Sequence, residues 1–255
     1  MKSAILRSQD ITVDFGAFRA IDNVSIEIET GKVYSIIGPN GAGKTTLINA
    51  LSGLQKPSAG KVFLKDEDIT RLEPHVRAMK GMGRSFQIVN IFPEMTVFEN
   101  LRLAGQAIKF GIQPLWRSVG QYRKLNEAAE EMISFIGLEQ YRDMKASLLS
   151  HGYQRSLELG IALMLNPEVL LLDEPLAGVG HHELKSTVEL IKKVAEDRTV
   201  VLIEHNIDVV MSISDMIIVL VAGQVLCTGT PTEIQANPKV REVYLGEEEE
   251  DHAIA

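Results

Sequence analysis

Short segments with strand character open this chain. Segments 4–6, 11–15 and 24–29 are rich in apolar and β-branched residues. Segment 24–29 also alternates apolar and charged residues, as a half-exposed antiparallel strand does. Segment 60–64 has the same strand character. Together these segments predict a small antiparallel sheet near the N-terminus.

The middle of the chain, about residues 73–165, has a mostly helical pattern. Thr96 and Glu99 form a capping-box signature for the start of a helix. Apolar residues then recur at helical spacing, at Val97, Leu101, Ala104 and Ile108. The segment 111–114 breaks this helix, and a second amphipathic helix is predicted from about 122 to 136.

Strands return after this helical region, where residues 169–172 and 199–203 are continuous apolar runs, typical of strands buried on both faces. The apolar run 33–37, which precedes the helical region, also predicts a buried strand. A helical segment, about 182–195, separates the last pair of these runs. This alternation indicates βαβ units and a parallel sheet.

These elements predict an α/β fold. Its parallel core is preceded by the antiparallel sheet, and a helical subdomain of about 88–165 is inserted into it. We expect one domain over residues 1–246. The acidic run that begins at Glu247 predicts a disordered tail over 247–255.

Composition adds constraints. The 255 residues are 45% apolar, which is ordinary for a chain with a real core. The formal net charge of −8 argues against a nucleic-acid-binding surface, and we expect no nucleic-acid partner. One cysteine, Cys227, and no signal peptide at Met1–Ala4 predict a reducing, cytoplasmic compartment. No apolar run reaches the roughly eighteen residues that a membrane span needs, so any spanning would fall to another chain.

The most specific motif follows the run 33–37. It matches G-x-x-x-x-G-K-[ST], the phosphate-binding P-loop, between a strand and a helix as that motif requires. Its backbone N–H groups and the helix N-terminus would hold phosphates; Lys44 would reach the β- and γ-phosphates, and the Thr45 hydroxyl would coordinate Mg²⁺. The predicted nucleotide-binding residues are Gly38, Pro39, Asn40, Gly41, Ala42, Gly43, Lys44, Thr45 and Thr46.

Acidic residues end the run 169–172. Asp173 would lie beside the P-loop and hold Mg²⁺ through water. Glu174, the next residue, could polarise the water that attacks the γ-phosphate. These positions predict a catalytic carboxylate and a metal ligand.

A histidine follows the other buried run. His205 follows the run 199–203, a strand that should neighbour the one ending at Asp173. It could contact the γ-phosphate or orient the water. The remaining histidines have no such context.

Residues 149–155, hereafter the signature segment, resemble the LSGGQ signature of ABC (ATP-binding cassette) ATPases. Ser150 and Gly152 keep the positions that approach the γ-phosphate in that family, whereas His151 and Tyr153 depart from the consensus. Gln87 resembles the glutamine of the family's Q-loop, which senses Mg²⁺ and the attacking water. The resemblance therefore adds Ser150 and Gly152 as nucleotide-binding residues, and Gln87 as a catalytic and metal-sensing residue.

The order of these motifs covers nearly the whole chain and is the ABC ATPase order. The resemblance also implies an aromatic residue on which adenine stacks. Phe15, in the step Phe15-Gly16, fits the family pattern, and Phe18 is its competitor.

The same resemblance implies a dimer, because in this family one chain holds only half of each ATP site. The second subunit could be a copy or a related chain, so a homodimer and a heterodimer both remain open. The family's helical insert contacts an integral membrane permease, and residues 88–93 follow Gln87 directly. The protein would then be peripheral, on the cytoplasmic face of the inner (plasma) membrane.

Three stretches, 83–87, 92–101 and 176–179, resemble ATPases of the branched-chain amino acid importers and their relatives for urea, amides or aromatic acids. The ending Val243-Tyr244-Leu245-Gly246 fits as well. The resemblance implies a nucleotide-binding subunit that hydrolyses ATP, with Mg²⁺, to power import of a small polar solute, which we expect to be a branched-chain or other amino acid. Alternatives are the ATPase of a lipopolysaccharide-type exporter and a soluble ABC ATPase that acts as an assembly factor. This sequence does not identify the solute, since specificity for the solute would belong to the permease and any external binding protein.

Overall fold

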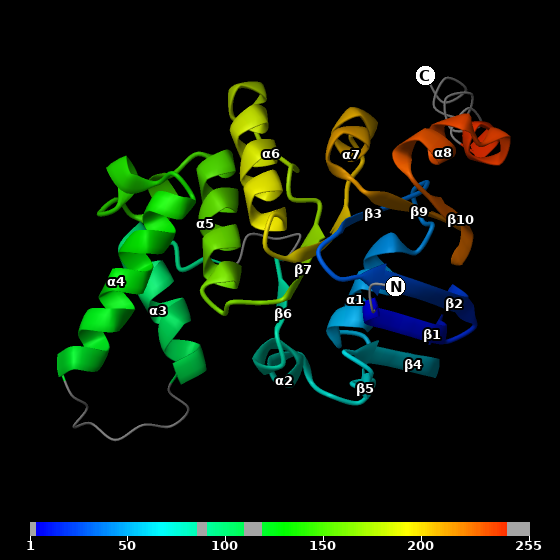
Figure 1. Cartoon of the computed structure of the whole chain (residues 1–255), viewed down its shortest axis with the longest axis horizontal. Helices are drawn as coiled ribbons and strands as arrows, with labels where there is room; N and C mark the ends of the chain where they lie inside the picture. Colours follow the sequence, from blue (N-terminus) through cyan, green and yellow to red (C-terminus); the bar gives the residue numbers. More distant parts are fainter. Residues whose placement is uncertain (1–3, 86–90, 110–118, 244–255) are drawn as a thin grey trace.

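The computed structural model of the chain, shown in Figure 1, describes residues 4–85, 91–109 and 119–243. Its strands form a four-stranded sheet and a six-stranded sheet. The order in the smaller sheet is β2 (Phe18–Glu29), β1 (Ala4–Phe15), β4 (Ala59–Leu64) and β5 (Glu67–Asp68). All pairs in this sheet are antiparallel, as expected for the N-terminal region.

The first strand differs in detail from expectation. The separate segments 4–6 and 11–15 are parts of the single strand β1. Its pairing with β2 shifts register between Ser8 and Ile11, and Asp10 lies there with a φ of 49°. Aspartate tolerates this left-handed conformation better than most residues. The irregularity at this point lies within one strand, but the sequence pattern predicts a break between two strands there.

The larger sheet carries the core. Its order is β10 (Gln224–Gly229), β9 (Met216–Val221), β3 (Val33–Ile37), β8 (Thr199–Ile203), β7 (Val169–Asp173) and β6 (Met82–Arg84). Strands from β9 to β6 pair in parallel, and β10 is antiparallel to β9. The predicted runs 33–37 and 199–203 are confirmed as β3 and β8. The strand β6 was not predicted, because its three residues lie within the mostly helical middle.

One helix fills the space between the sheets. α1 (Lys44–Ser52) buries Leu47, Ile48 and Leu51 completely, in a core shared with the inner faces of both sheets. The short α2 (Pro74–Met79) lies beside β6 in contact with it. Arg77 of α2 is buried and donates hydrogen bonds to the carbonyls of Ala50 and Leu51, at the end of α1.

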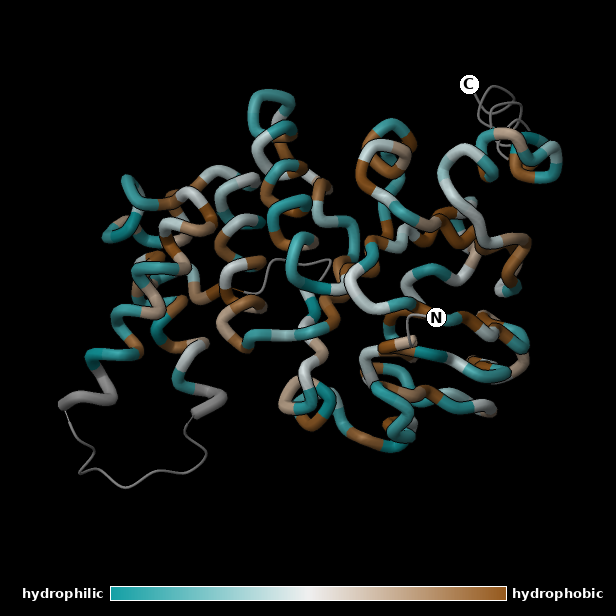
Figure 2. The backbone as a smooth tube through the Cα atoms, in the orientation of Figure 1, coloured by the Kyte–Doolittle hydropathy of each residue, from teal (hydrophilic) through white to brown (hydrophobic). Residues whose placement is uncertain are grey.

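The opposite face of the large sheet is covered by helices with a second core. Between β6 and β7 lie α3 (Val97–Lys109), α4 (Val119–Phe135), the 3₁₀ turns Glu139–Tyr141 and Ala146–Leu148, and α5 (His151–Leu163). Towards the C-terminus lie α6 (His181–Ala195), α7 (Ile207–Ile213) and α8 (Pro231–Ala236). Hydrophobic and hydrophilic stretches alternate along these helices, as expected when each buries one face (Figure 2).

The helical predictions hold in type and differ at the ends. Glu99 N–H donates to Thr96 Oγ1 at 3.1 Å, and Thr96 N–H donates to Glu99 Oε2 at 2.9 Å, which confirms the capping box. The second helix, predicted from about 122 to 136, is α4. Within the described residues, no helix has the length and apolarity to cross a bilayer. The tail 247–255 lies outside them, so its predicted disorder stays a prediction.

Candidate functional site

The P-loop connects β3 to α1 and is pressed against the backbone of neighbouring strands. A Cβ on Gly38, whose φ is 151°, would lie 2.0 Å from the carbonyl oxygen of Leu220. A Cβ on Gly43, whose φ is 97°, would lie 2.6 Å from the carbonyl oxygen of Ala20. Both glycines are therefore required by close packing as well as by backbone conformation.

Lys44 is buried inside this loop. Its Nζ donates hydrogen bonds to the carbonyl oxygens of Gly38, at 2.6 Å, and Pro39, at 2.9 Å. The ammonium group is thus held at the centre of the loop. Gly43, as the N-cap of α1, supplies no side-chain cap. The N-terminus of α1 therefore faces the loop with N–H groups that suit an anion.

A pocket of about 280 Å³ lies over the loop. Its walls come from β2, from the P-loop, from the first residue after β7 and from the second residue after β8. The lining residues are Phe18, Ala20, Asn40, Gly41, Ala42, Gly43, Lys44, Thr45, Thr46, Glu174 and His205. The fold therefore brings the predicted phosphate-binding residues together with Glu174 and His205.

Phe18, rather than Phe15, is the aromatic residue in this wall. The two residues are paired across the β1–β2 hairpin and both are exposed. Directly paired residues of an antiparallel hairpin share one face, so both rings belong to the same end of the hairpin. The choice between them as the adenine contact stays a proposal.

Glu174 and His205 are in direct contact. Glu174 Oε1 and His205 Nε2 lie 3.0 Å apart. Glu174 adopts a φ of 51°, unusual for a side chain of this size, and its N–H donates to the carbonyl of Ile203. Backbone held in this conformation is characteristic of functional sites, where it fixes the direction of a side chain.

Asp173, the last residue of β7, is fully buried. Burial raises the pKa of its carboxyl group, and the nearby Arg84 guanidinium opposes that shift. Oδ2 lies 3.4 Å from Arg84 Nη2, whereas Oδ1 has no hydrogen-bond partner in the part of the chain that the structure describes. A buried carboxylate oxygen without a donor fits the role predicted for Asp173, with Thr45 as the second oxygen ligand for Mg²⁺.

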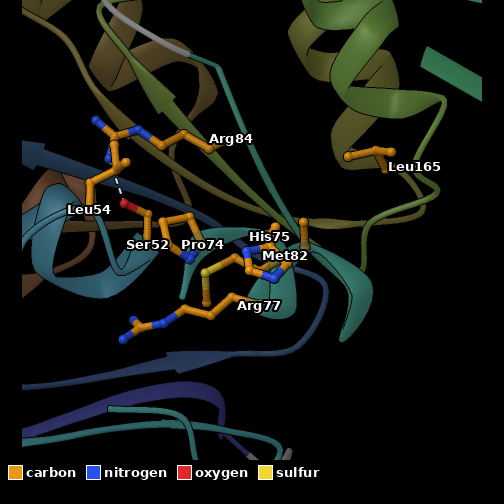
Figure 3. A pocket seen from close by; sticks show the side chains of 9 residues that line it. Ser52, Leu54, Pro74, His75, Arg77, Met82, Arg84 and Leu165 are labelled. Atoms are coloured by element: carbon orange, nitrogen blue, oxygen red, sulfur yellow. Dashed lines mark hydrogen bonds between the residues drawn. The ribbon is translucent and has the colours of Figure 1, made fainter. Parts of the chain in front are cut away.

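Arg84, at the end of β6, is a residue of this site that the sequence analysis missed. Its guanidinium also contacts Ser52 Oγ and Asn49 Oδ1 of α1. Burial lowers its pKa, and Asp173 counteracts this. Figure 3 shows Arg84 pointing towards Ser52, in the wall of a second pocket of about 220 Å³. No signal in the sequence indicated this role, because the short strand β6 was itself not predicted.

Glu204 is a second residue that was missed. Its buried carboxylate accepts hydrogen bonds from the N–H of Leu176 at 2.8 Å and from the N–H of His205 at 3.2 Å. Burial raises its pKa, and these N–H groups oppose the shift. Glu204 therefore ties the loop that follows Glu174 to the loop that carries His205. Its place next to His205 was the only signal in the sequence.

The remaining predicted residues lie elsewhere. Ser150 is the N-cap of α5 and accepts a hydrogen bond from the N–H of Tyr153, and Gly152 is buried in the first turn. Neither residue lines the pocket over the P-loop. Gln87 and residues 88–90 fall outside the described residues, so their predicted roles are untested. One chain thus assembles the P-loop half of the predicted site and holds the signature segment apart from it.

Comparisons with known proteins give the same picture. Residues 21–177 match the sequence profile of the ABC transporter family, and residues 224–250 match that of the branched-chain amino acid ATP-binding cassette transporters. The chain is 40% identical to the high-affinity branched-chain amino acid transport ATP-binding protein LivG of Salmonella typhimurium, over 97% of this chain and 100% of LivG.

Solved structures agree. The ADP conformation of MJ1267, an ATP-binding cassette of an ABC transporter, superposes with a TM-score of 0.84 and 34% identity, covering 96% of this chain and 100% of that one. The dimeric structure of MJ0796, a bacterial ABC transporter cassette, gives a TM-score of 0.76 and 27% identity, covering 89% and 98%. The chain therefore belongs to the ABC transporter family, as an ATP-binding subunit with ATPase activity.

Proposed function

We propose that this chain is the energising subunit of a membrane importer for branched-chain amino acids. The contact of Glu174 with His205 over the P-loop supports its ATPase role. The match of residues 224–250 to the branched-chain amino acid transporters, with the similarity to LivG over the whole chain, supports the solute class. The solute, a zwitterion with an apolar side chain, would be recognised by the other components.

In the proposed mechanism, the P-loop binds the phosphates of ATP and Lys44 neutralises charge on the β- and γ-phosphates. Glu174 accepts a proton from the attacking water. His205 holds the Glu174 carboxylate in place and itself contacts the γ-phosphate. Magnesium, held by Thr45 and Asp173, would supply further neutralisation of phosphate charge. Phe15 or Phe18 would stack on the adenine.

A second subunit completes the site in this proposal. Ser150 and Gly152 are absent from the pocket over the P-loop, and α5 presents them at its N-terminus. An N-terminus of this kind suits a γ-phosphate held by another chain. ATP would then join the two subunits, and hydrolysis would remove the anion that joins them. The partner is a copy of this chain or a related subunit.

The surface around Phe92 is the proposed contact with the permease. The Phe92 side chain is 53% exposed. Its N–H donates to Asn100 Oδ1 at 2.8 Å, and its carbonyl accepts from Asn100 Nδ2 at 3.0 Å. Asn100 is buried and also bonds to the carbonyls of Met95 and Thr96. An exposed aromatic ring on so firmly held a backbone suits a protein interface. Such a contact would keep the chain at the membrane surface, on the side where ATP is available.

Uptake of labelled leucine, isoleucine and valine by a strain that lacks this gene tests the solute class. The wild-type gene should restore uptake and the Glu174→Gln gene should not. If uptake of all three amino acids is independent of the gene, the solute assignment is wrong. Equal restoration by the Glu174→Gln gene would instead contradict the role of ATP hydrolysis.

A further inference from the structure

The hydroxyl group of Ser150 already has a strong acceptor within its own chain. Ser150 Oγ lies 2.6 Å from Glu183 Oε1, in the first turn of α6. The same oxygen accepts the N–H of Tyr153, so the hydroxyl hydrogen is directed to the carboxylate. Nε2 of the exposed His182 ring lies 3.8 Å from Glu183 Oε1. A serine has one hydroxyl hydrogen, and Glu183 holds it.

The carboxylate is also packed against Gly152. A Cβ on Gly152 would lie 2.4 Å from Glu183 Oε2. The Glu183 side chain is only 9% exposed, so it has little room to move aside. A larger residue at position 152 would therefore have to displace the Glu183 carboxylate, whatever the contact of this position with nucleotide. Glu183 thus stands at the N-terminus of α5, against both signature residues that we propose to meet the γ-phosphate.

An incoming γ-phosphate would compete with this carboxylate in two ways. It needs the same hydroxyl hydrogen, and it needs the same helix N-terminus. Two anions at one helix end also repel each other. Closure of the ATP-bound dimer must therefore break, at each site, a charge-assisted hydrogen bond that the open chain retains.

We propose that Glu183 is a positioning residue that keeps the Ser150 hydroxyl hydrogen-bonded within its own chain until ATP binds. Glu183 would thereby set the ATP concentration at which two subunits close. This inference rests on the proposed role of Ser150 toward the γ-phosphate. After hydrolysis, Glu183 recaptures the hydroxyl and favours reopening. Glu183 acts only on the signature side of the site, so it leaves binding of ATP to the P-loop of a single chain unchanged.

The test measures ATP-dependent dimer formation by analytical ultracentrifugation in a Glu174→Gln chain, with and without Glu183→Gln. Because a charge-assisted hydrogen bond is roughly twice as strong as a neutral one, we expect half-maximal dimer formation at about fivefold lower ATP concentration. The affinity of dilute, monomeric protein for a fluorescent ATP analogue should stay the same. Glu189→Gln, an exposed position on α6 that pairs with Lys192, is the matched control and should shift neither quantity.

A second comparison asks whether the effect passes through Ser150. In a Ser150→Ala chain, Glu183→Gln should lower the ATP requirement by clearly less than in the chain that keeps the serine, because only the competition for the helix N-terminus remains. An unchanged or higher requirement in the first test overturns the inference, and so does a shift of full size without the serine. If the Glu174→Gln chain forms no dimer at any ATP concentration, a composite site between two copies of this chain is refuted, and the inference for this chain with it. Circular dichroism checks folding, and Glu183→Asp, which withdraws the acceptor by one methylene, replaces an unfolded Glu183→Gln with the same expected shift.

Discussion

His205 Nε2 lies 3.0 Å from Glu174 Oε1, although the two residues are 31 positions apart in sequence. Their contact depends on the parallel register of β7 and β8, in which Asp173 pairs with Ile203. Glu174 is the first residue after Asp173 and His205 is the second residue after Ile203, so both leave their strands at the same edge of the sheet. Glu204 holds both loops through backbone N–H groups. The relative position of carboxylate and imidazole is thus set by the sheet.

Glu174→Gln should lower ATP turnover by about 100-fold or more, because a positioned general base contributes about 10² to 10⁴ in rate. ATP binding should survive, since the amide keeps the shape of the side chain, and an ATP-bound dimer should accumulate. Steady-state phosphate release and sedimentation measure these effects. Glu168→Gln, at an exposed residue that pairs with Lys65, is the control and should behave as wild type. Wild-type turnover in Glu174→Gln would show that another group orients the water.

Lys44→Ala should weaken ATP binding by about 10- to 100-fold, since hydrogen bonds to charged groups contribute about 1.5–3 kcal/mol. The substitution removes the ammonium group, which donates hydrogen bonds to the carbonyls of Gly38 and Pro39 and which we propose to bind the phosphates. Equilibrium binding of a fluorescent ATP analogue measures the change. Lys56→Ala removes a charge from an exposed residue and should leave the affinity unaltered. Equal affinities for the two variants would contradict the proposed role of Lys44.

Phe92→Asp should abolish uptake while ATP binding by the isolated chain is retained. A carboxylate placed at this exposed position would have to be desolvated in an interface with the permease, which is costly without a cationic partner. Uptake assays and nucleotide binding separate the two effects. Phe92→Leu keeps an apolar side chain and should retain most of the uptake. Normal uptake with aspartate at this position would place the permease contact elsewhere.

Arg77→Met should reduce the free energy of unfolding by about 2–4 kcal/mol, because buried carbonyls lose their donors. Arg77 bonds to the carbonyls of Ala50, Leu51, Leu72 and Thr70. Burial lowers the pKa of its guanidinium to about 10, which still leaves it charged at neutral pH.

Urea denaturation measures the Arg77→Met effect. Arg123→Met, at an exposed residue that pairs with Glu127 within α4, should change stability little. A loss no greater than that of Arg123→Met would mean that water replaces the guanidinium at these carbonyls.

The large sheet and the P-loop could be predicted because each has a local signal. Buried strands such as 199–203 are continuous apolar runs, and the P-loop has a fixed spacing of glycine and lysine. The positions of Asp173 and Glu174 followed from the end of such a run. Thr96 and Glu99 predicted the start of a helix, because the capping box joins two residues only three positions apart and is therefore visible in the sequence.

The roles of Arg84, Glu183 and Glu204 could not be predicted, because each depends on a partner far along the chain. Arg84 contacts Asp173, 89 positions away, and Glu183 contacts Ser150, 33 positions away. A single charged residue gives no local sign of such a partner. The irregularity at Asp10 escaped prediction for a related reason, since pairing with β2 and β4 keeps both parts of β1 in one strand.

Arg84 lines the pocket of Figure 3 and at the same time contacts Asp173 and the helix that follows the P-loop. The pocket over the P-loop shares none of its lining residues with this second one. A small molecule seated against Arg84 could therefore disturb Asp173 without displacing nucleotide. An inhibitor directed there would not need to occupy the ATP pocket, so it would act on the site without contacting the phosphate-binding loop.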